Sequence, residues 1–219
     1  MSKYKLDLDY VMPLIDISTA EKTLELSSDK PEALMQMGKV FYKTPEPKQE
    51  HLLKAIKMYS RAIQLKPDYA AAFNNRGLAY AKLLSVSGES NSQCNFEKAI
   101  IDFTEAIRLR PFEASYYCNR GAKYSELKER EKAIDDFSSA IKYSSDEFKK
   151  KTLIFLIRGQ EYLAIENYEK AISDFTESIR LSPNETKSFA LRARCYLFTG
   201  NHDKAREDLA EIRRLKKIM

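Results

Sequence analysis

Apolar residues recur at spacings of three and four along most of the chain, and two short phrases repeat in register. The first phrase combines arginine, a small residue and an aromatic residue, as in Asn75-Arg-Gly-Leu-Ala-Tyr80. The second combines alanine, aspartate and an aromatic residue, as in Glu97-Lys-Ala-Ile-Ile-Asp-Phe103. Both place their apolar positions on one stripe of a helix. The pattern predicts an all-α chain whose repeating unit is a pair of amphipathic helices.

The two phrases alternate through the rest of the chain. The first returns at 119–124, 157–162 and 191–196, and the second at 131–137, 169–175 and 203–209. A looser early copy has Gly38 and Phe41, followed by Lys54-Ala-Ile-Lys-Met-Tyr59. The recurrence in register favours a serial array of helix pairs over an irregular helical bundle.

Small residues in the phrases predict close contact between the two helices of each pair. A glycine inside a helix costs about 1 kcal/mol relative to alanine, so it suits places where two backbones pass closely. These glycines are Gly77, Gly121 and Gly159, and the matching alanines are Ala99, Ala133 and Ala171. Aromatic residues fill the remaining gap, and Pro67, Pro111 and Pro183 end three of the second helices.

These small, aromatic and proline positions resemble the tetratricopeptide repeat from about Pro31 to the C-terminus. The resemblance implies a right-handed α–α superhelical solenoid with repeats at about 31–67, 70–111, 114–145, 152–183 and 186–219. Residues 1–30 are predicted to be an N-terminal segment with a degenerate capping helix, because Ala20, Leu24 and Ser27 mimic the second-helix spacing. The last helix, predicted from Asp203 to Lys217, is polar over much of its surface and can cap the other end.

The intervals between the phrases vary. Gly38 to Ala55 is five residues longer than Gly121 to Ala133, and Gly77 to Ala99 is ten residues longer. The extra residues are polar and rich in turn formers, which predicts long loops at 43–51 and 85–95. Four additional residues around 146–151 predict either a lengthened second helix or a local bend.

Arginine and aspartate occur together in the repeats. Four repeats have both, namely Arg76 with Asp102, Arg120 with Asp136, Arg158 with Asp174, and Arg192 with Asp208. The first repeat has Met37 and Met58 at these places. The joint occurrence predicts a partly buried ion pair that two apolar side chains replace in the first repeat. A basic ladder for phosphates is the alternative, but it leaves the aspartates unexplained.

The resemblance implies that the first helices line a concave groove that binds a peptide or a helix of another protein. The N-terminal half of this predicted surface is polar and consists of Lys39, Asn74, Asn75, Lys82, Ser115 and Asn119. Its C-terminal half is apolar and consists of Leu153, Leu156, Ile157, Leu163, Leu191, Leu197 and Phe198. Asparagine can bond a peptide backbone as donor and acceptor. The apolar half indicates either a binding site or burial by neighbouring helices or by the N-terminal segment.

One subclass of the family binds the C-terminal carboxylates of chaperones through lysines, asparagines and an arginine from three consecutive repeats. In register, the first window of this chain has Met35, Lys39, Asn75, Ser115 and Asn119, and only Asn75 matches. Chaperone C-terminal tails are therefore disfavoured as partners.

Composition narrows the remaining functions. The chain is 43% hydrophobic and 32% charged with a net charge of +5, as in soluble globular proteins, and no apolar run reaches the roughly 18 residues of a membrane span. His51 and His202 lie far apart, and no phosphate loop, metal motif or nucleophile elbow occurs. We therefore expect no catalysis, cofactor or metal. The three cysteines are scattered, so we expect them to be free thiols and the protein to lie in the reducing cytoplasm. Assembly into a homo-oligomer, and less favourably nucleic-acid binding through basic residues, remain alternative functions.

Overall fold

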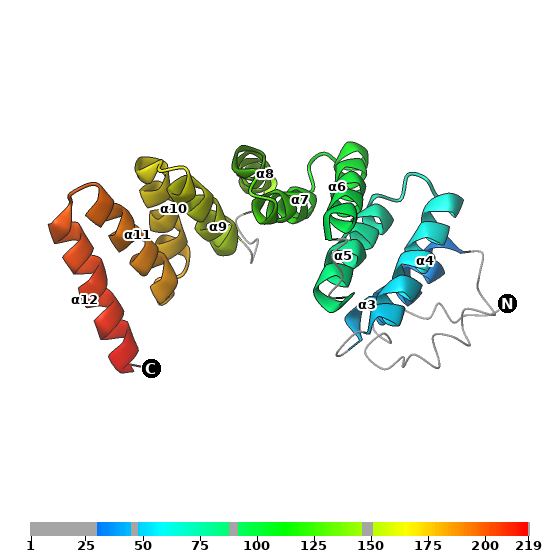
Figure 1. The fold of residues 1–219 in the computed structure, drawn as a ribbon, viewed down its shortest axis with the longest axis horizontal. Coiled ribbons are helices and arrows are strands. Elements are labelled where there is room, and N and C mark those ends of the chain that lie inside the picture. Colours follow the sequence, from blue (N-terminus) through cyan, green and yellow to red (C-terminus); the bar gives the residue numbers. More distant parts are fainter. Residues whose placement is uncertain (1–29, 45–47, 88–91, 146–150, 219) are drawn as a thin grey trace. The chain divides into compact units, whose positions relative to one another are not determined.

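The computed structural model describes residues 30–44, 48–87, 92–145 and 151–218, and within these ranges all regular structure is helical (Figure 1). The described residues fall into two compact units, one ending at Pro111 and the other beginning at Phe112. The first unit contains α3 (Pro31–Lys43), α4 (Gln49–Leu65), α5 (Ala70–Ser87) and α6 (Ser92–Leu109). The second contains α7 (Ala114–Glu126), α8 (Arg130–Tyr143), α9 (Lys151–Ala164), α10 (Tyr168–Leu181), α11 (Thr186–Phe198) and α12 (His202–Ile218).

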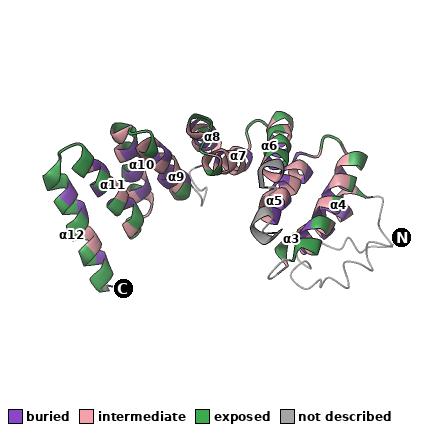
Figure 2. Cartoon of the chain, in the orientation of Figure 1, coloured by how far each residue is buried: buried purple, intermediate pink, exposed green. Residues whose placement is uncertain are grey.

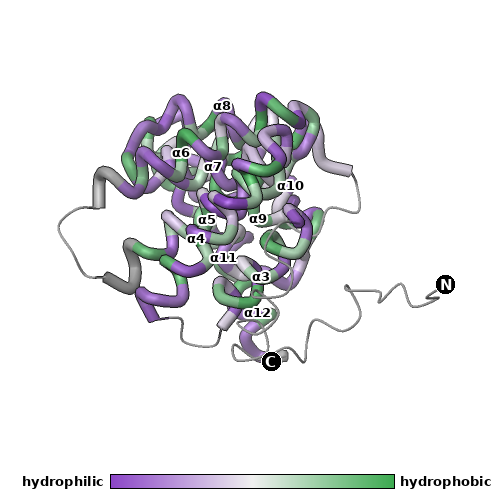
Figure 3. Tube along the Cα trace, turned by 90° about the vertical axis from the view of Figure 1, so that its right-hand side faces the viewer, coloured by the Kyte–Doolittle hydropathy of each residue, from purple (hydrophilic) through white to green (hydrophobic). Residues whose placement is uncertain are grey.

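The helices pack as successive pairs, which confirms the predicted repeating unit. Each odd-numbered helix contacts the even-numbered helix that follows it. Within the units, α4 also contacts α5, α8 contacts α9, and α10 contacts α11, so each pair is joined to the next. Hydrophilic and hydrophobic residues alternate along the trace of these helices (Figure 3), as expected when each helix buries one stripe.

The glycines lie where the two helices of a pair meet. A Cβ atom added to Gly121 would lie 3.0 Å from the Cβ of Asp136 in α8, and one added to Gly77 would lie 2.8 Å from the ring of Phe103 in α6. The Gly77 Cβ would also lie 3.1 Å from the backbone oxygen of Ala99. These approaches leave little room for a side chain, which confirms the predicted close contact between helices.

Buried alanines and aromatic residues form the core of each helix pair. The alanines and aromatic residues of the second phrase are buried, as in Ala133 with Phe137 and Ala171 with Phe175. Figure 2 shows such buried positions on the helices of both units, whereas α12 is exposed along most of its length. Among residues 202–217 of α12, whose burial the structure describes, only Ala205, Asp208 and Leu215 are buried.

The turns inside the last three pairs share one geometry. Lys128, Glu166 and Gly200 have φ angles of 62°, 60° and 74°, in the left-handed region. The next residue returns a backbone hydrogen bond to a tyrosine of the first helix, as in Glu129 to Tyr124 at 2.9 Å. This bond caps the first helix in the manner of a Schellman motif. Only one of the three left-handed positions is glycine, so glycine content alone could not have located these turns.

The predicted extra loops are wrong in extent. Residues 85–87 belong to α5 and residues 92–95 belong to α6, so the additional residues lengthen both helices to 18 residues. Once a helix has formed, each added residue gains a backbone hydrogen bond, and this outweighs a preference of serine and asparagine for turns. Similarly α4 begins at Gln49, inside the predicted loop 43–51.

The insertion near residue 146 does not lengthen the second helix. Helix α8 ends at Tyr143 and has 14 residues, the same as α10, so the lengthened-helix alternative is wrong. The bend that formed the other alternative would fall at 146–150, outside the described residues. The capping helix predicted for residues 1–30 also lies outside them, apart from residue 30 itself.

Candidate partner-binding surface

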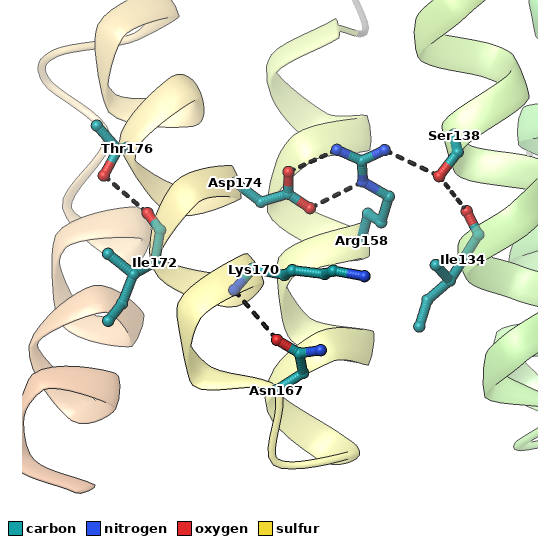
Figure 4. Close-up of polar contacts among 8 residues, drawn as sticks. All are labelled: Ile134, Ser138, Arg158, Asn167, Lys170, Ile172, Asp174 and Thr176. Carbon is teal, nitrogen blue, oxygen red and sulfur yellow. Dashed lines mark hydrogen bonds and ion pairs between the residues drawn. The ribbon is translucent and has the colours of Figure 1, made fainter. Parts of the chain in front are cut away.

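Arginine–aspartate pairs link the two helices in four of the repeats, as the sequence predicts. In each pair the guanidinium group donates two hydrogen bonds to the two carboxylate oxygens, at distances of 2.7–3.0 Å. Figure 4 shows this geometry for Arg158 and Asp174. In the first repeat, Met37 and Met58 are both buried in the core of the first unit. The methionines thus replace the ion pair with apolar packing.

A third contact ties three of these arginines to the preceding repeat. Arg158 donates to the hydroxyl of Ser138 in α8 at 2.9 Å (Figure 4), and Arg192 donates to the hydroxyl of Thr176 at 3.0 Å. Arg76 does the same to Ser60 at 3.1 Å. The sequence signal was a serine or threonine directly after the aromatic residue of the second phrase. These bonds engage the arginines internally, and so they weaken the interpretation as a ladder for phosphates.

Burial raises the pKa of two of the aspartates in these pairs, Asp102 and Asp174. Burial raises the pKa of the Asp174 carboxyl group above its ordinary value, although the hydrogen bonds and the charge of Arg158 oppose the change. The pKa of Asp102 is raised for the same reason, against the opposing effect of Arg76. The cost of removing the carboxylate from water is therefore comparable to the attraction within the pair.

A lysine of the second phrase also recurs in a contact that sequence reasoning missed. In every repeat this lysine lies over an aromatic ring of the paired first helix, with nitrogen–centroid distances of 5.3–5.6 Å. The contacts join Lys54 to Phe41, Lys98 to Tyr80, Lys132 to Tyr124, Lys170 to Tyr162, and Lys204 to Tyr196. Each is a cation–π interaction that helps to hold the pair together. The recurring Lys-Ala dipeptide was the available signal.

Two of the polar residues predicted for the first unit connect its two first helices. The Asn75 amide donates to the sulfur of Met35 at 3.7 Å, and its oxygen accepts a bond from the Asn74 amide at 3.2 Å. The ammonium group of Lys82 donates to the backbone oxygen of Tyr42 at 3.3 Å and lies 4.6 Å from the Tyr42 ring centroid. Lys39 is partly exposed, whereas Asn74 is buried and offers a partner almost no surface.

The two polar residues predicted for the second unit have different environments. The hydroxyl of Ser115 donates to the carboxylate of Glu113 at 2.8 Å, and the backbone N–H of Ser115 donates to the same oxygen. This arrangement caps the start of α7, because the carboxylate accepts from an N–H that has no partner in the helix. Asn119 lies one turn further on and is partly exposed. Both residues are partly exposed.

The predicted apolar residues of the second unit divide into exposed and buried sets. Leu153, Leu197 and Phe198 are 50%, 50% and 56% exposed. Ile157, Leu163 and Leu191 are partly buried against the cores of the unit. Leu156 is fully inside one of these cores, beside Phe175, so it cannot contact a partner. Burial by neighbouring helices thus accounts for part of the apolar set, and the exposed part remains available for binding.

Other side-chain chemistry is limited. Within the described ranges, no group of three or more histidine, cysteine, aspartate or glutamate residues is arranged to hold a metal ion. Burial raises the pKa of the Cys195 thiol to about 11, so this group stays protonated at neutral pH. None of the described helices combines the length and apolar character that crossing a membrane requires.

Family models match the chain in three places. A model described as "TPR repeat" matches residues 48–83, and models described as "Tetratricopeptide repeat" match residues 114–147 and 158–216, together more than half of the chain. The chain belongs to the tetratricopeptide repeat family. Its repeats are therefore those of an interaction or scaffold protein, in a family that is generally non-catalytic. A search of curated proteins found no match to the chain.

Solved structures share the same fold. MamA superposes with a TM-score of 0.72 at 16% identity, over 87% of this chain and 93% of that chain. MamA from Desulfovibrio magneticus RS-1, from residue 41 to its end, gives a TM-score of 0.71 at 16% identity, over 87% and 97% of the two chains. YrrB, described as a TPR protein with an unusual peptide-binding site, gives 0.71 at 16% identity, over 92% and 94%. These likenesses show an all-α superhelical repeat fold.

Proposed function

We propose that this tetratricopeptide repeat protein is a non-catalytic adaptor that binds a peptide or a helix of another protein on the first helices of its repeats. The observation that carries the proposal is the contact between successive first helices, since α3 contacts α5 and α9 contacts α11. Side chains from two repeats therefore lie within reach of one extended ligand. As part of the same proposal, the chain acts in the cytoplasm, where a reducing environment suits its scattered cysteines.

Contacts between the first helices support a binding role in the first unit. Asn75 and Lys82 of α5 bond to Met35 and Tyr42 of α3, so side chains on this face are already ordered before a ligand arrives. An ordered surface loses less side-chain entropy on binding than a mobile one. The amide of Asn75 remains partly exposed, and it can exchange its weak bond to sulfur for a stronger bond to a peptide carbonyl.

A paired substitution tests this proposal. Asn75→Ala with Asn119→Ala removes one amide from a first helix of each unit, and the loss of one hydrogen bond of about 1 kcal/mol to a ligand bound on either unit would weaken that binding about fivefold. The full chain is immobilised, proteins captured from native lysate are identified by mass spectrometry, and thermal unfolding is recorded for each variant. We expect selective loss of partners with an unchanged unfolding temperature.

The matched control is Lys57→Ala with Asp135→Ala, two exposed positions on the second helices α4 and α8. This control should capture the same partners as the unaltered chain. If instead both double variants retain every partner, or both lose the same partners, binding through the first helices is wrong.

A further inference from the structure

We infer that the surface formed by α9 and α11 binds an acidic amphipathic segment of a partner protein. In this arrangement apolar side chains of the segment pack on Leu197 and Phe198, and a carboxylate of the segment pairs with Arg194. The inference rests on the proposed function and specifies the chemistry of the ligand. We call this surface, defined by Leu163, Lys187, Arg194, Leu197 and Phe198, the α9–α11 face.

The charges on α9 and α11 are almost all of one sign. The two helices have a single acidic residue, Glu161, which is buried and accepts bonds from Ser125 at 2.5 Å and Arg130 at 2.8 Å. Their basic residues are Lys151, Arg158, Lys187, Arg192 and Arg194. The charge that these helices present to solvent is therefore positive.

Two of the basic residues are available to a ligand. Arg158 and Arg192 are bound to aspartates, as described above. Lys187 and Arg194 are exposed and form no ion pair among the residues that the structure describes. A partner carboxylate can therefore pair with either of them without breaking an ion pair between described residues.

Arg194 and Phe198 lie together in an ordered arrangement. The Phe198 ring stacks on Tyr168 of α10 with a centroid distance of 5.3 Å and an interplanar angle of 20°. The guanidinium carbon of Arg194 lies 5.5 Å from the Phe198 ring centroid. The stack holds the aromatic ring and the cation in place, so both are ordered before binding and the entropic cost of association is reduced.

An acidic amphipathic segment fits this surface better than other ligands. Leu197 and Phe198 are about half exposed, and large exposed apolar side chains beside a guanidinium group are typical binding anchors. Anionic membranes are generally bound by clusters of about four to eight basic residues. The α9–α11 face has two available basic residues, which are sufficient to recognise carboxylates on a short segment.

The experiment is a selection of random peptides displayed on phage against the immobilised full chain. Selected peptides are synthesised with a fluorescent label, and their affinities are measured by fluorescence anisotropy. We expect enrichment of peptides that combine leucine or phenylalanine with aspartate or glutamate. Arg194→Glu should weaken their binding about tenfold or more by charge repulsion, and Leu197→Ser about thirtyfold through loss of an apolar anchor.

The controls are chosen on second helices, where the same changes should have no effect. Ile101→Ser removes an apolar side chain that is 66% exposed on α6, and Lys57→Glu reverses an exposed charge on α4. Thermal unfolding of every variant shows whether the fold is retained. Arg194→Glu alters only an exposed side chain, so it decides the question even if Leu197→Ser unfolds the chain.

The outcomes separate this inference from the proposed function. Peptides that respond to Asn75→Ala with Asn119→Ala, but not to Arg194→Glu or Leu197→Ser, would overturn the inference and leave the proposed function in place. Failure to enrich any peptide would count against both. Two parallel measurements, of binding to phosphatidylserine vesicles and of self-association by sedimentation, complete the test. If no peptide binds and Arg194→Glu abolishes vesicle binding, the face binds a lipid surface. If no peptide binds and Arg194→Glu abolishes self-association, the face binds a second copy of the chain.

Discussion

The Arg158–Asp174 pair offers a quantitative test of how these repeats are held together. The Asp174 carboxylate is only 4% exposed and accepts bonds from Arg158 at 2.7 and 2.9 Å. Charges about 4 Å apart attract by roughly 4 kcal/mol at an effective dielectric constant of about 20. Removing each ion from water costs several kcal/mol, which offsets this attraction. The raised pKa of Asp174 is in line with such a balance.

The first repeat shows which replacement preserves the packing. Met37 and Met58 occupy the equivalent positions and are buried there. We therefore expect Arg158→Met with Asp174→Met to change the free energy of unfolding by less than about 1 kcal/mol, or to raise it by about 1–4 kcal/mol. The hydroxyl of Ser138 would keep a partner, because it also donates to the backbone oxygen of Ile134 at 2.7 Å.

The single variants should behave very differently. Asp174→Met leaves the Arg158 guanidinium group largely buried without its carboxylate, and the expected loss of stability is about 3–5 kcal/mol. Arg158→Met should cost a similar amount, because it leaves a carboxylate buried without its arginine. The assay is urea unfolding followed by far-UV circular dichroism on the unaltered chain and the three variants. A double variant that loses as much stability as the two single variants combined would refute the reasoning.

The other two predictions concern pH and the glycines. Burial raises the folded-state pKa of Asp174 above its ordinary value of 3.8, so the stability that this group contributes is complete below pH 3.8 and is lost as the pH rises through the folded-state value. The double methionine variant lacks this group, and its advantage in stability over the unaltered chain should therefore increase across that pH interval. A difference in urea unfolding that does not change with pH would contradict this. Gly38→Ala should destabilise by about 1–3 kcal/mol despite a helix-propensity gain of about 1 kcal/mol, since its Cβ would lie 2.3 Å from the Tyr59 ring. Gly121→Ala, whose nearest contact is 3.0 Å, should be closer to neutral, and equal effects in thermal unfolding would refute the ranking.

Features that depend on a pair of positions within the chain could be predicted from the sequence. Arginine and aspartate occur together in four repeats and are replaced together by methionines in the first. The helix pairing and the close contacts at Gly77 and Gly121 were also predictable, because a mid-helix glycine needs a packing reason. In each case the sequence contains both partners of the contact.

Other features could be recognised only in the structure. The lengths of α5 and α6 could not be predicted, because the balance between helix extension and turn formation is small for serine and asparagine. The burial of Leu156 and Asn74 was also missed. Both lie three residues before a glycine of the first phrase, and residues three apart share one face of a helix. That spacing assigns them to the stripe that packs against the second helix, and it was a signal that could have excluded them from the binding surface.

The fifth repeat illustrates why the core is easier to infer than the binding surface. It has Ala193 where the other repeats have glycine, and Leu209 where they have a larger aromatic residue. The added methyl group on one helix thus accompanies the loss of an aromatic ring on the other, and Leu209 is 40% exposed whereas its aromatic counterparts are buried. A residue that contacts a partner has its complement in another molecule, so no such compensation occurs inside this chain. Residues of the α9–α11 face can therefore be recognised only by their exposure, charge and ordered geometry, because the side chains complementary to them belong to the ligand.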